Sequence, residues 1–346
     1  MTAIDFEERD LEASVPDLGA GGAWTRVRLR WRRDPLTGAS ARILTGVKLQ
    51  PSSRPDMAEL TAKPAFCPFD SEYLETATVP FPAELTAEGR IRVGQAVVVP
   101  NILAYATHSA VGIYDPGRHF IDLDEMTPGL VGDALAAMVR HARAVRRIDP
   151  QAQWSSINAN CLPPAGSSLV HPHLQSAHDA HGLTGQRLLV ERSRAWKERH
   201  GSYWAALVDQ EADGPRWVGQ IGRVAWLTPF APTGFGEVWG VVTGAADITE
   251  LTDGDCRALG QGLSQVLAAY RAWNLASFNF GIVGGGPHGH EDGYQVVLKV
   301  LSRSNPEPVY RSDATYFERI WGEALIDLSP EEVAEGVRAR FDHPGS

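Results

Sequence analysis

Two stretches of the chain share one order of features, and this repeat constrains the fold more than any other property. In each stretch, apolar strand-like runs come before a capped amphipathic pattern that begins at Thr127 or Thr252 and predicts a helix. The first helix is expected to end near Arg147. An alternating strand follows each helix, with Asn158 in the first copy and Asn279 in the second. Such a repeat predicts two strand–strand–helix–strand units, paired into one continuous sheet.

Length and composition predict a soluble protein with one large domain or two of ordinary size. The chain has 346 residues, of which 43% are hydrophobic and 21% charged. Its net charge of −10 argues against partners held by bulk positive charge, such as nucleic acid or an anionic membrane. Three scattered cysteines, an acidic N-terminus and the absence of a long apolar run predict a cytoplasmic protein without disulfides or a membrane segment.

The N-terminal region divides into two parts. Residues 1–23 are polar and rich in glycine, and we expect them to form a loose arm. Residues 24–49 alternate on both sides of an Asp-Pro-Leu-Thr-Gly turn, which predicts a hairpin with basic side chains facing outward.

The segment 158–175 is the part of the chain best equipped for chemistry. It ends in the string His-Pro-His-Leu-Gln, and alternation along a strand would place His171, His173 and Gln175 on one face. A neutral imidazole is a good nucleophile at pH 7, and glutamine can donate a hydrogen bond to a phosphoryl oxygen without adding charge. On its own, a His-x-His pair is more often structural or a metal pair than catalytic.

A small-residue turn precedes these histidines. Gly166, Ser167 and Ser168 offer backbone N–H groups and hydroxyls where a phosphate could approach closely. Together the string reads Asn-x5-Gly-Ser-Ser-x2-His-Pro-His-x-Gln, starting at Asn160. It resembles the active-site segment of the galactose-1-phosphate uridylyltransferases, a family of the histidine-triad superfamily.

The resemblance covers roughly residues 24–341 and implies an α+β fold. Two tandem histidine-triad-like repeats would form antiparallel sheet(s) with flanking helices. Residues 24–200 would be the first unit, which carries the His-Pro-His-Leu-Gln site. Residues 201–346 would be a second, degenerate unit, because no His-x-His stands at its final strand.

The resemblance also implies nucleotidyl transfer in two steps through a covalent intermediate. His173 would attack the α-phosphorus of a nucleotide sugar and release a sugar 1-phosphate; a second phosphate would then take the nucleotidyl group. The Pro172 carbonyl is expected to fix the tautomer of His173. Gln175, Ser167 and Ser168 would stabilise the charge on the transferring phosphoryl group.

Further nucleotide contacts are implied at several positions. Asn160 and Gly166 belong to the motif itself, and Asn101 follows a buried apolar strand at a place where the family has a comparable asparagine. A simple asparagine turn is the alternative for Asn101. Lys48 and Arg54 follow the N-terminal turn, and solvated surface charge is the alternative for both.

A zinc site is the expected cofactor site, and no organic cofactor is implied. The family often has Cys-Pro-Phe-Cys where this chain has Cys-Pro-Phe-Asp, which gives Cys67 and Asp70 as ligands. His119 and His171 would complete the set, with His108 as a competitor for the place of His119. The alternative is a site that has lost its metal.

The remaining histidines are interpreted as surface residues rather than as parts of a metal or substrate site. His178 and His181 are expected in a solvated loop rather than as metal ligands, and a charged helix is expected around residues 188–199. His288 and His290 lie in a glycine-rich stretch that reads as a surface loop, with a lid over the substrate as the alternative.

The sugar-recognition region departs from the family. Ser312, Asp313, Ala314 and Leu325 stand where the family recognises the hexose with charged and amide side chains, so a substrate other than galactose 1-phosphate is expected. The expected partners are a nucleotide sugar, a phosphorylated small molecule and a second copy in a homodimer. Two alternatives stay open: a nucleotide-sugar or dinucleotide phosphorylase of the same fold, and a non-catalytic nucleotide-binding homologue.

Overall fold

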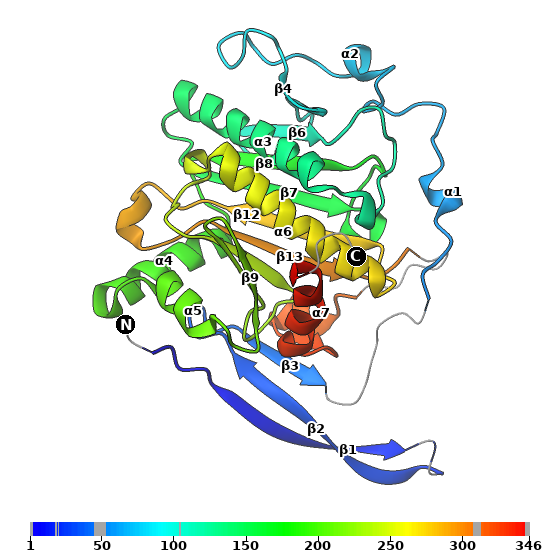
Figure 1. The fold of residues 1–346 in the computed structure, drawn as a ribbon, viewed down its shortest axis with the longest axis vertical. Helices are drawn as coiled ribbons and strands as arrows, with labels where there is room; N and C mark the ends of the chain where they lie inside the picture. The colour runs from blue at the N-terminus through cyan, green and yellow to red at the C-terminus, as the bar shows by residue number, and fades with distance from the viewer. Residues whose placement is uncertain are drawn as a thin grey trace.

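One antiparallel sheet runs through the middle of the molecule (Figure 1). The structure is a computed structural model that describes residues 3–17, 19, 21–44, 53–103, 105–306 and 313–342. Within these residues the sheet has ten strands, in the order β4-β5-β6-β8-β7-β12-β13-β11-β10-β9. The strands are β4 (Ile91–Val93), β5 (Ala96–Pro100), β6 (His108–Ile113), β7 (Trp154–Cys161), β8 (His173–Asp179), β9 (Trp217–Ile221), β10 (Val224–Leu227), β11 (Val238–Val242), β12 (Ser277–Val283) and β13 (Val297–Arg303).

The sheet consists of two halves with the same topology. Read from its two edges, the order β4-β5-β6-β8-β7 repeats as β9-β10-β11-β13-β12. The halves meet where β7 pairs with β12, and in that register Asn160 lies opposite Asn279. The predicted antiparallel sheet with flanking helices is therefore confirmed, and its two halves form one continuous surface.

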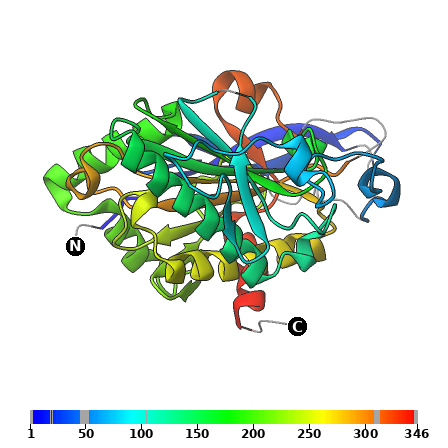
Figure 2. The same cartoon turned by 90° about the horizontal axis from the view of Figure 1, so that it is seen from above.

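Two long helices cover one face of the sheet, as Figure 2 shows from above. They are α3 (Pro128–Ile148) and α6 (Asp253–Ala272), and each begins after the threonine that the sequence indicated. Thr127 accepts a hydrogen bond from the N–H of Leu130, and Thr252 forms a reciprocal capping box with Asp255. The predicted helix starts are confirmed.

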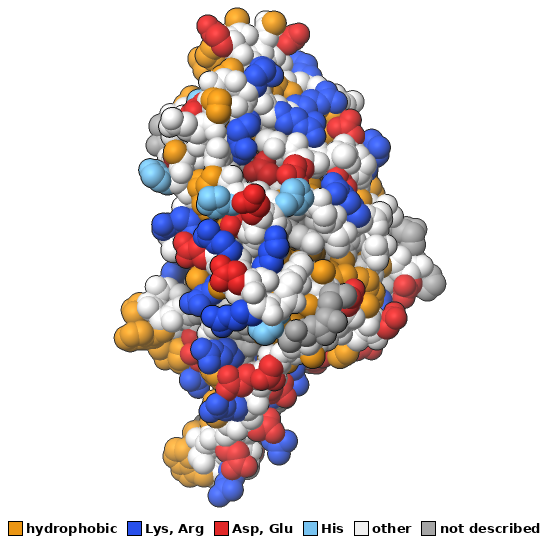
Figure 3. All heavy atoms as spheres, turned by 90° about the vertical axis from the view of Figure 1, so that its left-hand side faces the viewer, with side chains coloured by type: hydrophobic (Ala, Val, Ile, Leu, Met, Phe, Trp, Pro, Cys, Tyr) orange, Lys and Arg blue, Asp and Glu red, His pale blue; other side chains and the backbone are white. Residues whose placement is uncertain are grey.

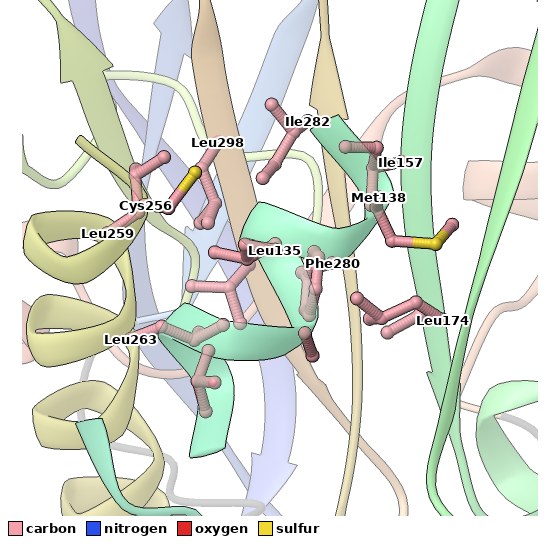
Figure 4. Packing of buried hydrophobic residues seen from close by; sticks show 14 of the residues in the cluster. Leu135, Met138, Ile157, Leu174, Cys256, Leu259, Leu263, Phe280, Ile282 and Leu298 are labelled. Carbon is pink, nitrogen blue, oxygen red and sulfur yellow. The ribbon is translucent and has the colours of Figure 1, made fainter. Parts of the chain in front are cut away.

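The core lies between these helices and the sheet (Figure 4). Leu135 and Met138 of α3 and Leu263 of α6 meet apolar side chains from the central strands, all of them buried. The two helices approach closely at Gly132 and Gly260, because a Cβ atom on Gly260 would lie 2.6 Å from the Gly132 nitrogen. The two halves thus share one core.

Further helical segments lie around both halves of the sheet. They are α1 (Ala58–Thr61), α2 (Leu74–Ala77), α4 (Thr184–His200), α5 (Tyr203–Glu211), α7 (Pro330–Asp342), the 3-10 turns η1 (Leu123–Glu125), η2 (Pro163–Ala165), η3 (Ile248–Glu250) and η4 (Gly289–Asp292), and the π-helical turn η5 (Phe317–Trp321). The charged helix expected around residues 188–199 is α4. Together α4 and α5 form an apolar cluster with strands of the second half, on the sheet face opposite α3 and α6. We call the uncovered part of that face, around β7, β8 and β12, the site face.

The N-terminal residues do not form the loose arm that was expected. Strand β1 (Glu8–Asp17) pairs along its whole length with β2 (Ala23–Arg33), which in turn pairs with β3 (Ser40–Leu44), while β14 (Ala324–Ile326) completes a second, four-stranded sheet. The predicted hairpin is the β2–β3 pair. The extra strand follows from cross-strand charge, since acidic residues of β1 lie opposite arginines of β2, as Glu8 lies opposite Arg32.

The exposed surface carries mixed charge. On the face shown in Figure 3, basic and acidic side chains are interspersed, so this face has no extended basic area for a nucleic-acid backbone. Among the described residues, no helix is both long and apolar enough to cross a membrane.

The loop that contains His288 and His290 lies against α4, where Lys197 donates hydrogen bonds to the carbonyls of His290 and Glu291.

His178 is not in a solvated loop, contrary to the expectation. Strand β8 continues to Asp179, and alternation places His178 on the helix side of the sheet, where it is fully buried. Its Nδ1 lies 2.9 Å from the Ser155 hydroxyl, and its Nε2 lies 3.2 Å from Nδ1 of the buried His141. His181, just past the end of the strand, is exposed as expected. Polar composition concealed a strand whose histidine faces the core.

This buried pair predicts a pH-dependent stability. Burial lowers the pKa of His178 to about 3, helped by the nearby His108 and Arg146, and it lowers the pKa of His141 as well. The unfolded chain, with histidine pKa values near ~6.5, therefore binds more protons below that pH than the folded chain does. Stability should fall as the pH drops from ~6.5 to ~5, by about 1.4 kcal/mol per pH unit for each such histidine.

Thermal unfolding of the wild type and of His178→Asn between pH 7.5 and 5 measures this slope. We expect a shallower pH dependence of Tm in His178→Asn and an unchanged one in the control His181→Asn. Equal slopes in all three proteins would refute the assignment.

Candidate active site

His173 is the first residue of β8, and its side chain lies on the site face. The next residue, Leu174, is buried in the helix-side core, so alternation turns His173 and Gln175 the other way. The strand expected to carry His171, His173 and Gln175 on one face begins only at His173 and continues to Asp179, so His171 precedes it.

A backbone hydrogen bond fixes the tautomer of His173. Its Nδ1 lies 2.8 Å from the carbonyl oxygen of His171, and because a carbonyl only accepts, Nδ1 carries the proton. The Nε2 atom then has a free lone pair. The expectation that the Pro172 carbonyl would play this part is wrong, since the strand direction turns that carbonyl toward the N–H of Tyr114.

Burial keeps the His173 imidazole neutral. The ring is 8% exposed, and its desolvation lowers the pKa of His173, while the hydrogen bond to the His171 carbonyl opposes part of that shift. The Phe69 ring meets the imidazole edge-on, with centroids 5.2 Å apart. A neutral ring with its Nε2 lone pair free has the protonation state of a nucleophile at pH 7.

Four side chains expected as metal ligands do come together next to His173. One ligand atom from each of Cys67, Asp70, His119 and His171 lies within 4.8 Å of all the others. Nδ1 of His119 and Nδ1 of His171 are each 3.0 Å from the same carboxylate oxygen, Asp70 Oδ1. His108, the competitor, pairs instead with Asp149.

The hydrogen-bond pattern of this cluster fits a bound cation. Nε2 of His171 lies 3.1 Å from the carbonyl oxygen of Asp115 and so carries the proton, which leaves a lone pair on Nδ1. That lone pair faces a carboxylate oxygen at 3.0 Å, and two acceptors at this distance repel each other unless a proton or a metal ion lies between them. In addition, the buried Asp70 Oδ2 has no hydrogen-bond partner among the described residues, although the half-exposed Lys63 ammonium lies 3.7 Å from it. One thiolate, one carboxylate and two imidazoles are a suitable ligand set for zinc.

The cluster ties three segments together. Cys67 and Asp70 belong to the loop before α2, His119 follows β6, and His171 leads directly into His173. The contacts of the His171 ring with Asp70 and the Asp115 carbonyl thus restrain the residue whose own carbonyl accepts the hydrogen bond from His173 Nδ1.

Polar side chains continue from His173 across the site face. Gln175 lies opposite Asn158, the pairing runs on to Ala159 and Leu174, and one more step along the same register would bring Asn160 opposite His173. Asn158, Asn160 and Gln175 are partly exposed, while Ala159, between the two asparagines, is buried on the helix side. The structure therefore brings the predicted catalytic residues and Asn160 onto one surface.

In the turn before the histidines, Ser168 has hydrogen-bond donors that no described group accepts. Gly166 has φ +92°, a left-handed conformation that favours glycine, with open space where a Cβ would be. The Ser167 hydroxyl donates to the carbonyl of Leu169, and the N–H groups of Gly166 and Ser167 bond to carbonyls in the same turn. Ser168 is exposed, and no hydrogen bond of its hydroxyl or N–H occurs within the described part of the chain.

Two other predicted nucleotide contacts have local partners. Asn101 forms an asparagine turn, in which it accepts from the N–H of Leu103 and donates to the Tyr105 hydroxyl. Arg54 makes a two-pronged ion pair with Asp122, and no described contact joins it to the site face. Lys48 lies outside the described residues.

Sequence reasoning missed a contribution from the second half. Asn279 donates to Asn160 Oδ1 at 2.7 Å, and Arg303 donates to Asn279 Oδ1 at 2.7 Å. Asp313, expected only as a departure from the family pattern, holds Arg303 through two hydrogen bonds. Of the other sugar-recognition positions, Leu325 lies in β14 and Ser312 falls outside the described residues. The only sequence signal for the contribution of Asn279 was its match with Asn158 in the internal repeat.

Comparison with known proteins identifies the fold. No family model matches the chain. An uncharacterised protein of Archaeoglobus fulgidus is 26% identical over 329 residues, which are 94% of this chain and 97% of that protein. Among solved structures, an ADP-glucose phosphorylase from Arabidopsis thaliana, solved with bound ADP-glucose, superposes with a TM-score of 0.69 at 18% identity over 89% of this chain and 98% of that one. A uridylyltransferase superposes with a TM-score of 0.67 at 20% identity, over 91% and 99%.

The chain has the uridylyltransferase fold. A GalT-like protein of Arabidopsis thaliana shares it as well, with a TM-score of 0.68 at 19% identity over 89% of this chain and 98% of that one. The expected structural likeness to this group is confirmed along almost the whole chain. On this fold, the neutral His173 is the group suited to act as a nucleophile, and the adjacent cluster is the group suited to bind a metal ion.

The ligand cluster gives a direct prediction. Purified protein reconstituted with zinc should hold about one zinc ion per chain by elemental analysis, and Asp70→Ala or His119→Ala should weaken that binding by about ten- to a hundredfold or more, since each removes a ligand. His108→Ala is the matched control and should keep its zinc, because its partner is Asp149. Full zinc occupancy in Asp70→Ala, or none in the wild type, would contradict the site.

Proposed function

We propose that this protein is a nucleotidyltransferase that passes a nucleoside monophosphate between a nucleotide sugar and a sugar 1-phosphate or similar phosphate. The observation that carries the proposal is the hydrogen bond from His173 Nδ1 to the His171 carbonyl. It leaves a neutral imidazole with its Nε2 lone pair free, in a fold shared with uridylyltransferases and an ADP-glucose phosphorylase.

The first step forms a covalent intermediate. The Nε2 lone pair attacks the α-phosphorus, a P–N bond forms, and the bond from the α-phosphorus to the bridging oxygen breaks, so that the sugar 1-phosphate leaves with the electron pair. The positive charge that develops on the imidazole is shared with Nδ1, whose proton stays bonded to the His171 carbonyl. No proton has to leave the ring.

The second step reverses the first with another phosphate. An oxygen of the incoming phosphate attacks the α-phosphorus, the P–N bond breaks, and the electron pair returns to Nε2. Gln175, partly exposed on the site face, and the donors of Ser168 would hydrogen-bond the non-bridging oxygens, where charge builds up in both transition states.

The metal site would have a supporting part. Bound at Cys67, Asp70, His119 and His171, a zinc ion would supply positive charge and cross-link the segments that fix the His171 carbonyl. Every reacting atom in the two steps belongs to His173 or the substrates.

The acceptor is expected to differ from galactose 1-phosphate. Asp313 is committed to Arg303, and Leu325 offers no polar group, so this region lacks the charged and amide set expected for that hexose. A phosphorylase of the same fold is the second candidate, favoured by the likeness to an ADP-glucose phosphorylase. A non-catalytic nucleotide-binding protein is the third, and the homodimer stays a prediction.

The adduct provides the test. Incubation with UDP-, ADP-, GDP-, CDP- and dTDP-sugars, followed by intact-protein mass spectrometry, should show a gain of one nucleoside monophosphate with at least one donor. His173→Gln should fold with a similar Tm and gain nothing, because glutamine lacks the nucleophilic nitrogen.

His181→Gln, an exposed histidine outside the site, is the matched control and should form the adduct as the wild type does. An adduct that persists in His173→Gln would overturn the assignment of the nucleophile. Discharge of the isolated adduct by a sugar 1-phosphate but not by inorganic phosphate would distinguish the transferase from the phosphorylase.

A further inference from the structure

A chain of hydrogen bonds crosses the centre of the sheet from the second half to the first. Asp313 holds the Arg303 guanidinium with bonds of 2.8 and 2.6 Å, Arg303 donates to Asn279 Oδ1, and Asn279 donates to Asn160 Oδ1. Arg303 and Asp313 are mostly buried, with 16% and 12% of their side chains exposed. We call these four residues the relay.

The contacts of the relay determine which atom donates and which atom accepts in each of its hydrogen bonds. A guanidinium can only donate, so the atom of Asn279 that faces Arg303 is its oxygen. The carbonyl oxygen of Ala165 can only accept, so the atom of Asn279 that lies 2.9 Å from it is its nitrogen. These two independent contacts fix the orientation of the Asn279 amide.

That orientation passes on to Asn160. The Asn279 nitrogen lies 2.7 Å from the Asn160 side chain, and a donor requires an acceptor, so the facing atom is Asn160 Oδ1. Asn160 Nδ2 is therefore turned away from β12, and it donates no hydrogen bond among the described residues. Its side chain is partly exposed on the site face, and one step beyond the last pair of the β7–β8 register would bring it opposite His173.

We propose that Asn279 and Arg303 are positioning residues that make Asn160 a hydrogen-bond donor to an acceptor oxygen of the phosphorylated substrate bound at His173. The inference rests on the proposed function and extends it, because it assigns the second half a part in substrate recognition. Only groups with free lone pairs, such as phosphate oxygens, suit this position; a group that must donate meets a second donor there.

The same asparagine also holds the turn that would surround the phosphate. The Ala165 carbonyl comes directly before Gly166, in the turn that continues to Ser168, so its bond from Asn279 anchors this turn to β12. One side chain of the second half thus restrains both Asn160 and the donors of Ser168.

Substitution by aspartate tests the polarity. In Asn279→Asp the carboxylate still accepts from Arg303 but cannot donate, so Asn160 would have to rotate and turn its oxygen toward the substrate. We expect Kd for ADP and UDP, measured by calorimetry, to rise about ten- to a hundredfold, as for the loss of a hydrogen bond to a charged group. KM for adduct formation with the active nucleotide sugar should rise by a similar factor.

His181→Gln, an exposed residue outside the relay, is the control and should bind both nucleotides as the wild type does. Asn160→Asp is the second test in case Asn279→Asp fails to fold. It keeps the bond from Asn279, replaces the outward donor with a carboxylate oxygen and adds a negative charge beside the substrate phosphate, so a loss of affinity at least as large is expected.

The outcomes separate this inference from the proposed function. A wild type that binds ADP or UDP but forms no adduct would end the proposed function, while the two variants still test the relay through Kd. A purely structural role for Asn279 would lower Tm and leave Kd unchanged. Wild-type Kd in folded Asn160→Asp and Asn279→Asp, or a wild type that binds neither nucleotide, would overturn the inference.

Discussion

The antiparallel pairing of β7 with β12 is the interaction on which the rest of the structure depends. It joins two five-stranded halves through the edge strands β7 and β12, whose hydrogen-bonding groups would otherwise be unpaired. It also brings α3 and α6 side by side over one core. It also places Asn160 next to Asn279, so the site face is continuous across the two halves. A shift of β12 by one residue in this register would turn Asn279 into the core and away from Asn160.

The two halves share a backbone plan but differ in chemistry. Asn158 pairs with Gln175 in the first half, and the matching Asn279 pairs with Leu301 in the second. By the same comparison Lys299 takes the place of His173, and its ammonium lies 4.2 Å from the centre of the Trp239 ring. The second half therefore offers no nucleophilic imidazole at this position, and its contribution is structural support and the relay.

Sequence could predict features that depend on local order or on a resemblance, and not those that depend on register. The helix starts at Thr127 and Thr252 follow from capping chemistry, and the cluster of four candidate metal ligands follows from the family motif. The bond of Asn279 to Asn160 needs the pairing of two strands far apart in the chain. The burial of His178 needs the true end of β8, and the partner of His173 needs the direction of one backbone carbonyl.

In the proposed mechanism, His173 reacts through Nε2 because its Nδ1 is bonded to the His171 carbonyl. Phosphorus NMR of the denatured nucleotidyl adduct can identify the reacting atom, since phosphoramidates on the two imidazole nitrogens give separate signals. We expect one signal from a phosphorus on Nε2 and none after His173→Gln. A signal from Nδ1, or from a phosphate ester on oxygen, would show that this assignment is wrong.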